Sequence, residues 1–203
     1  MAATIIKGSY LMTKEGLKQG WGVKVEGNRI LQVAPNDQIL AAAGDVVVDA
    51  TNRLIAPGFV NGHMHMYGVL SHGITAEALV TEFSSFLEDY WWPYVENRID
   101  QDLARLTTQW SCVEMIDSGI TSFTDILEAP TSIPGVLEVE AEVVRKAGLR
   151  AFLTFEACQR ISEENAQLGL KENADFVRRN NKPGNLVQGM MSVHTLFTGS
   201  KEY

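Results

Sequence analysis

The chain has 203 residues, of which 45% are hydrophobic and 21% charged, a composition typical of a globular protein. The formal net charge is −8 and the Lys and Arg residues form no cluster, which argues against a nucleic acid or an anionic membrane as partner. The sequence also lacks an apolar run of the roughly 20 residues that a membrane helix needs, and we expect no signal peptide at its start.

Residues 1–55 predict a small β-sandwich or barrel segment, because short runs rich in Val and Ile alternate with turn residues. A hairpin turn is expected at residues 26–29, where Gly and Asn tolerate a positive φ. The segment contains no histidine and no cluster of carboxylates, so we assign it a structural role. The expected strands cover residues 3–10, 20–26, 29–34 and 45–49.

Residues 56–203 predict an alternation of strands and helices, which is typical of an α/β fold with a parallel sheet. Asp100 and Ser162 are expected to cap two of the helices at their N-termini. Gly119 and Gly148 are expected to end two of them, at junctions that resemble each other as in a repeated unit. The expected strands cover residues 54–66, 120–127, 149–157 and 185–194, and the helices cover 75–97, 100–118, 134–146 and 162–180.

Two of these helices carry apolar patterns. The first is dense in aromatic residues, which most often pack in a core; near the mouth of a site they would instead wall a pocket for a ring. The second helix has apolar residues at helical spacing, which predict one buried face. These residues are Leu103, Leu106, Trp110 and Val113.

The histidines His63 and His65 follow the apolar run that begins at residue 54. In an extended strand, side chains at positions i and i+2 point to the same face, so the two imidazoles would converge on one point. A metal ion fits there, because neutral imidazole is a common ligand with bonds of about 2.0–2.1 Å. The alternative is that an H-x-H pair lies on the surface by chance.

The segment around these histidines resembles a family signature. Residues 57–65, Pro-Gly-Phe-Val-Asn-Gly-His-Met-His, are similar to the pattern P-G-[FL]-[IV]-[ND]-x-H-x-H of the amidohydrolase superfamily. The resemblance implies a metal-dependent (β/α)8 barrel with His63 and His65 as ligands of a divalent ion, Zn²⁺ or Fe²⁺. Members with two ions often carry a bridging lysine on strand four; no Lys occurs between residues 185 and 200, so one ion is expected.

Polar residues end the later strands, where a βα barrel places its reactive groups. Asp125, Glu156, Arg160 and His194 are therefore candidate substrate-binding residues. For Asp125 the alternative is a helix cap or a hydrogen bond to a loop. For Glu156 and Arg160 the alternative is an ion pair with each other.

His194 begins the stretch His-Thr-Leu-Phe-Thr-Gly-Ser, which resembles the H-x-x-[YF]-T-x-S stretch of the aminohydrolase branch. That branch includes S-adenosylhomocysteine and methylthioadenosine deaminases and triazine hydrolases. The resemblance implies that His194 contacts substrate. It also implies that the third metal histidine, the proton-shuttling histidine and an aspartate lie beyond Tyr203, so no catalytic acid or base is expected in this chain. The Trp91–Trp92 pair and the stretch that contains Phe155, Glu156, Arg160, Glu163 and Glu164 are similar to aminohydrolases associated with selenium metabolism.

The resulting hypothesis is a hydrolase that acts on a non-peptide C–N bond, with deamination of a small nitrogen heterocycle by metal-activated water as the first choice. Dechlorination and amide hydrolysis stay open. His72 stands where the nucleoside deaminases have Arg in their L-x-R-G pattern, which puts an adenosyl substrate in doubt; His72 itself is expected to be a loop residue.

The rival hypothesis is a catalytically incomplete, metal-binding half-barrel that needs a partner or a missing C-terminal half. It rests on the expected four βα units, since a closed barrel has eight. We therefore expect the N-terminal half of a longer protein, with a small-molecule substrate and with homo-oligomer formation left open. Cys112 and Cys158 are far apart and are interpreted as reduced thiols of a cytoplasmic protein, with a disulfide as the alternative.

Overall fold

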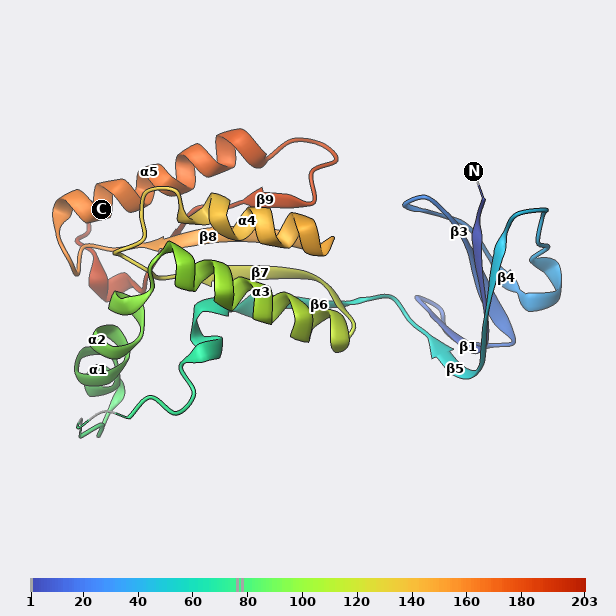
Figure 1. Ribbon diagram of the computed structural model, residues 1–203, viewed down its shortest axis with the longest axis horizontal. Coiled ribbons are helices and arrows are strands. Elements are labelled where there is room, and N and C mark those ends of the chain that lie inside the picture. Colours follow the sequence, from blue (N-terminus) through green and yellow to red (C-terminus); the bar gives the residue numbers. More distant parts are fainter. Residues whose placement is uncertain (1, 76, 78) are drawn as a thin grey trace. The chain divides into compact units, whose positions relative to one another are not determined.

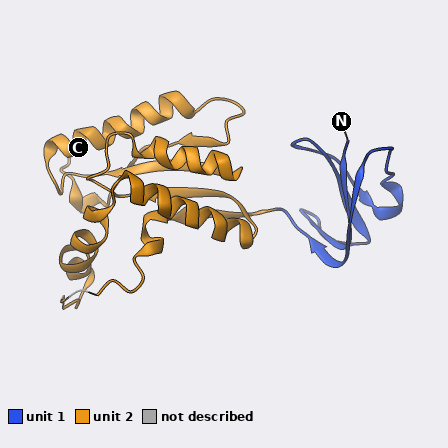
Figure 2. Ribbon diagram, in the orientation of Figure 1, with its two compact units in different colours: residues 1–57 blue, residues 58–203 orange. Residues whose placement is uncertain are grey.

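The computed structural model describes residues 2–75, 77 and 79–203 (Figure 1). The chain divides into two compact units, Met1–Pro57 and Gly58–Tyr203 (Figure 2). Each unit is built on a sheet of its own. Within the described part of the chain, no helix is both long and apolar enough to cross a membrane.

The first unit is one sheet of five strands, in the order β2-β1-β3-β4, with β5 parallel to β1. Ile5, Ala34 and Ile39 form its buried apolar cluster. The four strands predicted from the sequence are present, and β2 was not predicted. The strands are β1 Thr4–Thr13, β2 Gly16–Gln19, β3 Trp21–Glu26, β4 Arg29–Pro35 and β5 Val46–Ile55.

The boundary between the last strand of this unit and the first strand of the next differs from the prediction. Leu54 and Ile55 pair with Tyr10 and Leu11 of β1, so they belong to β5. The strand that carries the H-x-H pair starts later, as β6 Phe59–Met64. The apolar run that begins at residue 54 therefore contributes residues to two sheets. Pro57 and Gly58 lie between the two strands, which the apolar pattern alone predicted as one strand.

The second unit is a parallel sheet in which β7 lies between β6 and β8, and both β9 and β10 pair with β8. The helix α3 packs against β7, while α4 and α5 pack against β8 (Figure 1). This is the predicted mixed α/β arrangement of the first βα units of a (β/α)8 barrel. The remaining elements are β7 Ile120–Leu127, β8 Arg150–Ala157, β9 Val187–Gly189, β10 Ser192–Val193, α3 Gln101–Asp117, α4 Val136–Ala147 and α5 Glu163–Asn180.

The helix ends follow the sequence signals. Asp100 accepts a hydrogen bond from the Leu103 amide at 2.8 Å, and Ser162 accepts one from the Asn165 amide at 3.1 Å. Gly148 ends α4 in the left-handed region, with a φ of 75°. Both predicted caps are confirmed, because capping depends on residues close together in the chain.

The predicted buried face of α3 is wrong except at Leu103, which is half-buried against the core. Leu106, Trp110 and Val113 are 51%, 55% and 66% exposed. The buried positions carry mostly small residues, which let a helix approach its neighbours closely. Three of these residues are polar, and two of them, Thr107 and Thr108, donate their hydroxyls to the Ala104 carbonyl, so neither of these two donors is left unpaired by burial. The buried residues are Ala104, Thr107, Thr108, Ser111, Cys112 and Met115.

Two further elements differ from the prediction. The helix predicted over residues 75–97 includes residues 76 and 78, which lie outside the described residues, and the helical segment begins at Phe83. It is irregular, with α1 Phe83–Ser85, a π-helical turn at Phe86–Trp91, α2 Trp92–Tyr94 and a 3-10 turn at Glu96–Arg98. The strand predicted over residues 185–194 is divided into β9 and β10.

Asn173 of α5 connects the helix to two strands. Its side-chain oxygen accepts from the Phe155 amide at 2.7 Å, and its nitrogen donates to the Phe155 carbonyl at 2.7 Å and to the Ser192 carbonyl at 3.3 Å.

Because Asn173 is fully buried, we expect Asn173→Ala to lower the free energy of unfolding by about 1–3 kcal/mol in urea denaturation. Asn165→Ala, which removes one side-chain hydrogen bond to the Pro130 carbonyl, is the control and should lower the free energy of unfolding by less. Equal losses of stability in the two variants would argue that Asn173 has no special role in connecting α5 to the strands.

Candidate functional site

His63 and His65 lie at the end of β6 with their ring centroids 5.0 Å apart and the rings nearly perpendicular, at 86°. The Nδ1 atom of His65 is 2.7 Å from the Ile126 carbonyl, which can only accept a hydrogen bond. Nδ1 therefore carries the proton, and Nε2 keeps the lone pair that binds metals. Both histidine side chains are exposed.

The pair fits a divalent metal ion. A tetrahedral ion with Zn–N bonds of about 2.0–2.1 Å places two imidazole centroids roughly 5 Å apart, close to the separation of His63 and His65. The hydrogen bond from His65 to a backbone carbonyl is the support that metal-bound histidines usually have. Zinc sites take three or four protein ligands, of which this pair would supply two.

Asp125 of β7 supports the same histidine through the backbone. Its carboxylate accepts a hydrogen bond from the Met66 amide at 2.7 Å, directly after His65 in the chain. Burial, partly offset by this bond, raises the pKa of Asp125 to about 7. The structure therefore gives Asp125 the loop hydrogen bond that the sequence left as the alternative to substrate contact.

The other three candidates meet in a second group, the carboxylate–histidine cluster of Glu96, Glu128, Glu156, Arg160 and His194. Arg160 pairs with Glu128 through Nε and with Glu96 through Nη2, the latter at 3.2 Å. The Arg160 side chain is 7% exposed and those of Glu96 and Glu128 are 1% and 0% exposed, so both contacts are buried. The alternative of an ion pair between Glu156 and Arg160 is not formed, since the carboxyl groups that Arg160 contacts are those of Glu96 and Glu128.

His194 takes the place of Arg160 as the partner of Glu156. Its Nδ1 is 3.0 Å from Oε2 of Glu156 and also 3.0 Å from Oε2 of Glu128. Burial alone would lower the pKa of His194, but the contacts with Glu128 and Glu156 raise it to about 10. For Glu128, burial alone would raise the pKa, but bonding with His194 lowers it. His194 is thus a cation held between two carboxylates.

The carboxylate–histidine cluster is close to neutral. Burial, and then the charge of Glu128, raise the pKa of Glu96 to about 9, so Glu96 is protonated at neutral pH. The charges of Glu128 and Glu156 then balance those of Arg160 and His194. Glu96, Glu128 and His194 have ligand atoms within 4.8 Å of one another, a spacing a metal ion could bridge. Because Arg160 and His194 already supply the positive charge, an ion there would have to displace them.

Tyr67 lies between the histidine pair and the cluster. Its ring centroid is 5.5 Å from that of His65, and its hydroxyl donates to Glu96 at 2.9 Å. Trp92 covers the cluster on another side, with the Arg160 guanidinium 4.9 Å from its ring centroid and the His194 ring at 6.3 Å. The two groups at the ends of β6, β7, β8 and β10 are therefore parts of one site.

Sequence reasoning missed Tyr67, Trp92, Glu96 and Glu128 as members of this site. Glu128 carried a usable signal, since it is an acid directly after a predicted strand that ends at residue 127. The aromatic stretch before residue 97 was noted, with core packing and a pocket wall as alternatives; Trp92 packs on both cations of the cluster. Glu96 lies in an irregular turn and carried no signal.

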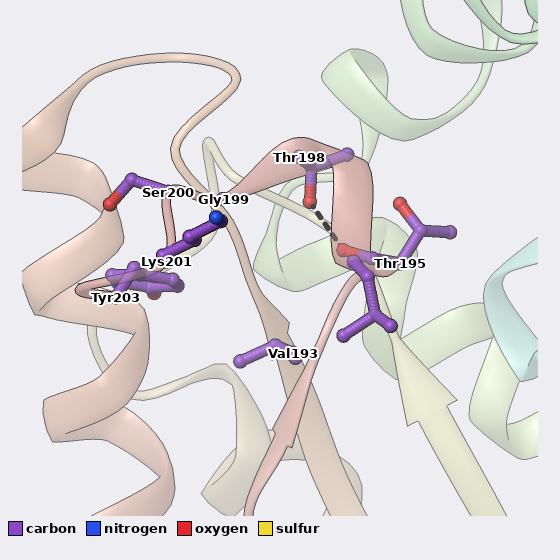
Figure 3. Close-up of a pocket in the computed structure, with 8 residues that line it drawn as sticks. Val193, Thr195, Thr198, Gly199, Ser200, Lys201 and Tyr203 are labelled. Carbon is purple, nitrogen blue, oxygen red and sulfur yellow. Dashed lines mark hydrogen bonds between the residues drawn. The ribbon is translucent and has the colours of Figure 1, made fainter.

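A cavity of about 350 Å³ lies between the end of β10 and the C-terminal turns, and His194 is not among the residues that line it (Figure 3). Thr195 has a φ of 44°, unusual for a β-branched residue. The Thr198 hydroxyl donates to the Thr195 carbonyl at 3.1 Å, as Figure 3 shows. The cavity is lined by Val193, Thr195, Leu196, Thr198, Gly199, Ser200, Lys201 and Tyr203.

The sequence of the chain matches one family model and is similar to curated proteins. Residues 54–202 match the model described as "Amidohydrolase family". The chain is 33% identical over 182 residues, 89% of this chain and 40% of the relative, to a 5-methylthioadenosine/S-adenosylhomocysteine deaminase of Archaeoglobus fulgidus. It is 29% identical over 208 residues, 100% of this chain and 44% of the relative, to a 5'-deoxyadenosine deaminase of Methanococcoides burtonii. The chain spans less than half the length of these curated relatives.

Solved structures share the fold. The chain superposes on a zinc-containing atrazine chlorohydrolase of Arthrobacter aurescens with a TM-score of 0.78 and 16% identity, covering 98% of this chain and 48% of that one. It superposes on an adenosine deaminase of Xanthomonas campestris with bound zinc, with a TM-score of 0.72 and 18% identity, covering 97% and 44% of the two chains. At these identities the likeness is one of fold.

Proposed function

The chain belongs to the amidohydrolase family, and from that membership we propose that the protein is a metal-dependent hydrolase of a non-peptide C–N bond. Its reaction is the deamination of a small nitrogen heterocycle, with an adenosine-type purine as the first substrate class to test. The observation that carries the proposal is the His63–His65 pair, whose spacing and fixed His65 tautomer suit one divalent ion, zinc before iron.

The chain's residues have separable roles in this proposal. A bound zinc ion would lower the pKa of its water to about 7, which would supply a nucleophile at neutral pH. The Ile126 carbonyl and the Asp125 carboxylate hold His65 in position. His194 faces the substrate, and Glu156 and Glu128 hold its ring. A general acid and base would come from the remainder of the protein.

The relatives favour deamination over the other options. The curated proteins at 33% and 29% identity are named as deaminases of adenosine-type compounds. A half-barrel that only binds metal is not favoured, since the relatives are enzymes. The proposal includes a cytoplasmic location, in keeping with Cys112 and Cys158, which are both buried free thiols.

An ammonia-release assay on the purified full-length protein tests the reaction class. We expect ammonia release from 5'-deoxyadenosine or 5-methylthioadenosine, loss of activity after dialysis against a metal chelator, and recovery when Zn²⁺ is added. A chlorotriazine serves as the comparison substrate, with chloride release as its readout. Chloride release without ammonia release from any aminopurine would contradict deamination.

A further inference from the structure

The backbone of His194 is fixed on both sides. Its amide donates to the Ala157 carbonyl at 3.0 Å, and the Thr198 hydroxyl donates to its carbonyl. Thr195, the next residue, has a φ of 44°, a conformation that β-branched residues seldom adopt and that persists only where the surroundings enforce it. Figure 3 shows Thr195 beside Thr198 in this turn. The position of the imidazole is thus set by the fold.

The two nitrogens of the His194 ring have different surroundings. Nδ1 faces Glu156, which accepts its hydrogen bond, and Glu128, which lies at the same distance of 3.0 Å. Nε2 is buried and has no hydrogen-bond partner among the described residues. A buried N–H without a partner is costly, so this edge of the ring is suited to receive an acceptor atom from a ligand. Trp92 Nε1 and Thr195 Oγ1 are likewise buried without a partner in the described part of the chain.

Glu128 is held in place through Oε1, the oxygen that does not face His194. It is fully buried, pairs with Arg160, and accepts a weak hydrogen bond from the Cys158 thiol at 3.5 Å. Arg160 is itself anchored by Asn97 at 2.8 Å and by Glu96. Glu128 therefore has little freedom to move away from the His194 ring.

We propose that Glu128 is a positioning residue that, together with Glu156, holds the Nδ1 edge of His194 so that Nε2–H is offered as a hydrogen-bond donor to the substrate. The matching substrate atom is an acceptor, such as a ring nitrogen or a carbonyl oxygen of the heterocycle. The inference rests on the proposed function, since it requires that a substrate occupies this site. The charged groups that face His194 are Glu96, Glu128, Glu156 and Arg160.

Glu128→Gln separates positioning from folding. The amide keeps the shape of the side chain but removes the negative charge beside His194. Without the charge of Glu128, the pKa of Glu96 should fall, which favours an ionised Glu96 as the partner of Arg160. We therefore expect the variant to fold.

The test is a histidine NMR titration of the full-length protein with 15N-labelled histidine, in which His194→Asn assigns the signal. In Glu128→Gln we expect the His194 midpoint to fall by at least about one pH unit. The alkaline limb of the kcat/KM profile should move down with it, so that the loss of activity is larger at pH 9 than at pH 7. Glu142→Gln is the matched control, because Glu142 is an exposed glutamate paired with Arg105.

An unmoved His194 midpoint in folded Glu128→Gln would overturn the proposal. If that variant fails to fold, Glu128→Asp replaces it; the shorter side chain keeps the charge but withdraws it, and a smaller downward shift is expected. A midpoint identical to wild type in Glu128→Asp overturns the proposal equally. The NMR readout needs no turnover, so a protein that releases no ammonia refutes the proposed function, while the titration still judges the role of Glu128.

Discussion

Replacing Arg160 by methionine is expected to lower the free energy of unfolding by about 3–5 kcal/mol, because it leaves the buried charge of Glu128 with only one of its two cationic partners, His194. Methionine preserves much of the aliphatic stem, so the loss reports on the guanidinium rather than on packing. Urea denaturation at pH 7 measures the difference from wild type.

The matched control is Arg105→Met. Arg105 pairs with Glu142 at 3.4 Å, but the two side chains are 39% and 51% exposed, so the expected loss is below about 1 kcal/mol. Similar losses in the two variants would show that the buried position of Arg160 has no special importance.

The effect of Arg160→Met should also depend on pH. The pKa of Glu128 is held below its ordinary value in the folded protein, so its contribution to stability is present above the ordinary glutamate pKa and is lost as the pH falls below it. Acid removes the Glu128 charge that has lost Arg160 as a partner in the variant. The difference between wild type and Arg160→Met is therefore expected to shrink as the pH is lowered from 7 towards 4. A constant difference would contradict the electrostatic explanation.

Replacing His63 or His65 by alanine is expected to remove bound metal and to reduce turnover to background, with the fold unchanged. Loss of residues that merely support a ligand costs about 10- to 100-fold in metal affinity or activity, so loss of a ligand itself should exceed that. Both side chains are exposed, so their removal opens no cavity. Metal content by mass spectrometry, ammonia release and circular dichroism measure the three consequences.

His72→Ala is the control for these variants. His72 is an exposed histidine in the turn after the pair and is expected to have no ligand role. Metal and activity should persist in this variant. Turnover that survives His63→Ala, or metal that is lost only from His72→Ala, would contradict the assignment of the ligands.

Local signals predicted much of this fold. The caps at Asp100 and Ser162, the glycine that ends α4 and the strand over residues 120–127 all depend on residues within a few positions of one another. The buried face of α3 was mispredicted because the spacing of apolar residues shows only that they share one face of the helix, whereas packing decides which face is buried.

The site could be predicted only in part, for a similar reason. His63 and His65 are neighbours in a motif, and Asp125, Glu156 and His194 were found from their place at strand ends. The carboxylate partners of Arg160 are distant in the sequence: Glu128 lies 32 residues away and Glu96 lies 64 residues away. Without those partners the sequence could only pair Arg160 with the nearby Glu156. The fold instead gives Glu156 to His194.

The most direct test of the account is the position of the metal. Anomalous diffraction at the zinc absorption edge, from crystals of the zinc-loaded full-length protein, locates the ion without any assay of activity. We predict one peak at about 2.0–2.1 Å from the Nε2 atoms of both His63 and His65. A peak among Glu96, Glu128 and His194 instead, with none at the histidine pair, would contradict the account.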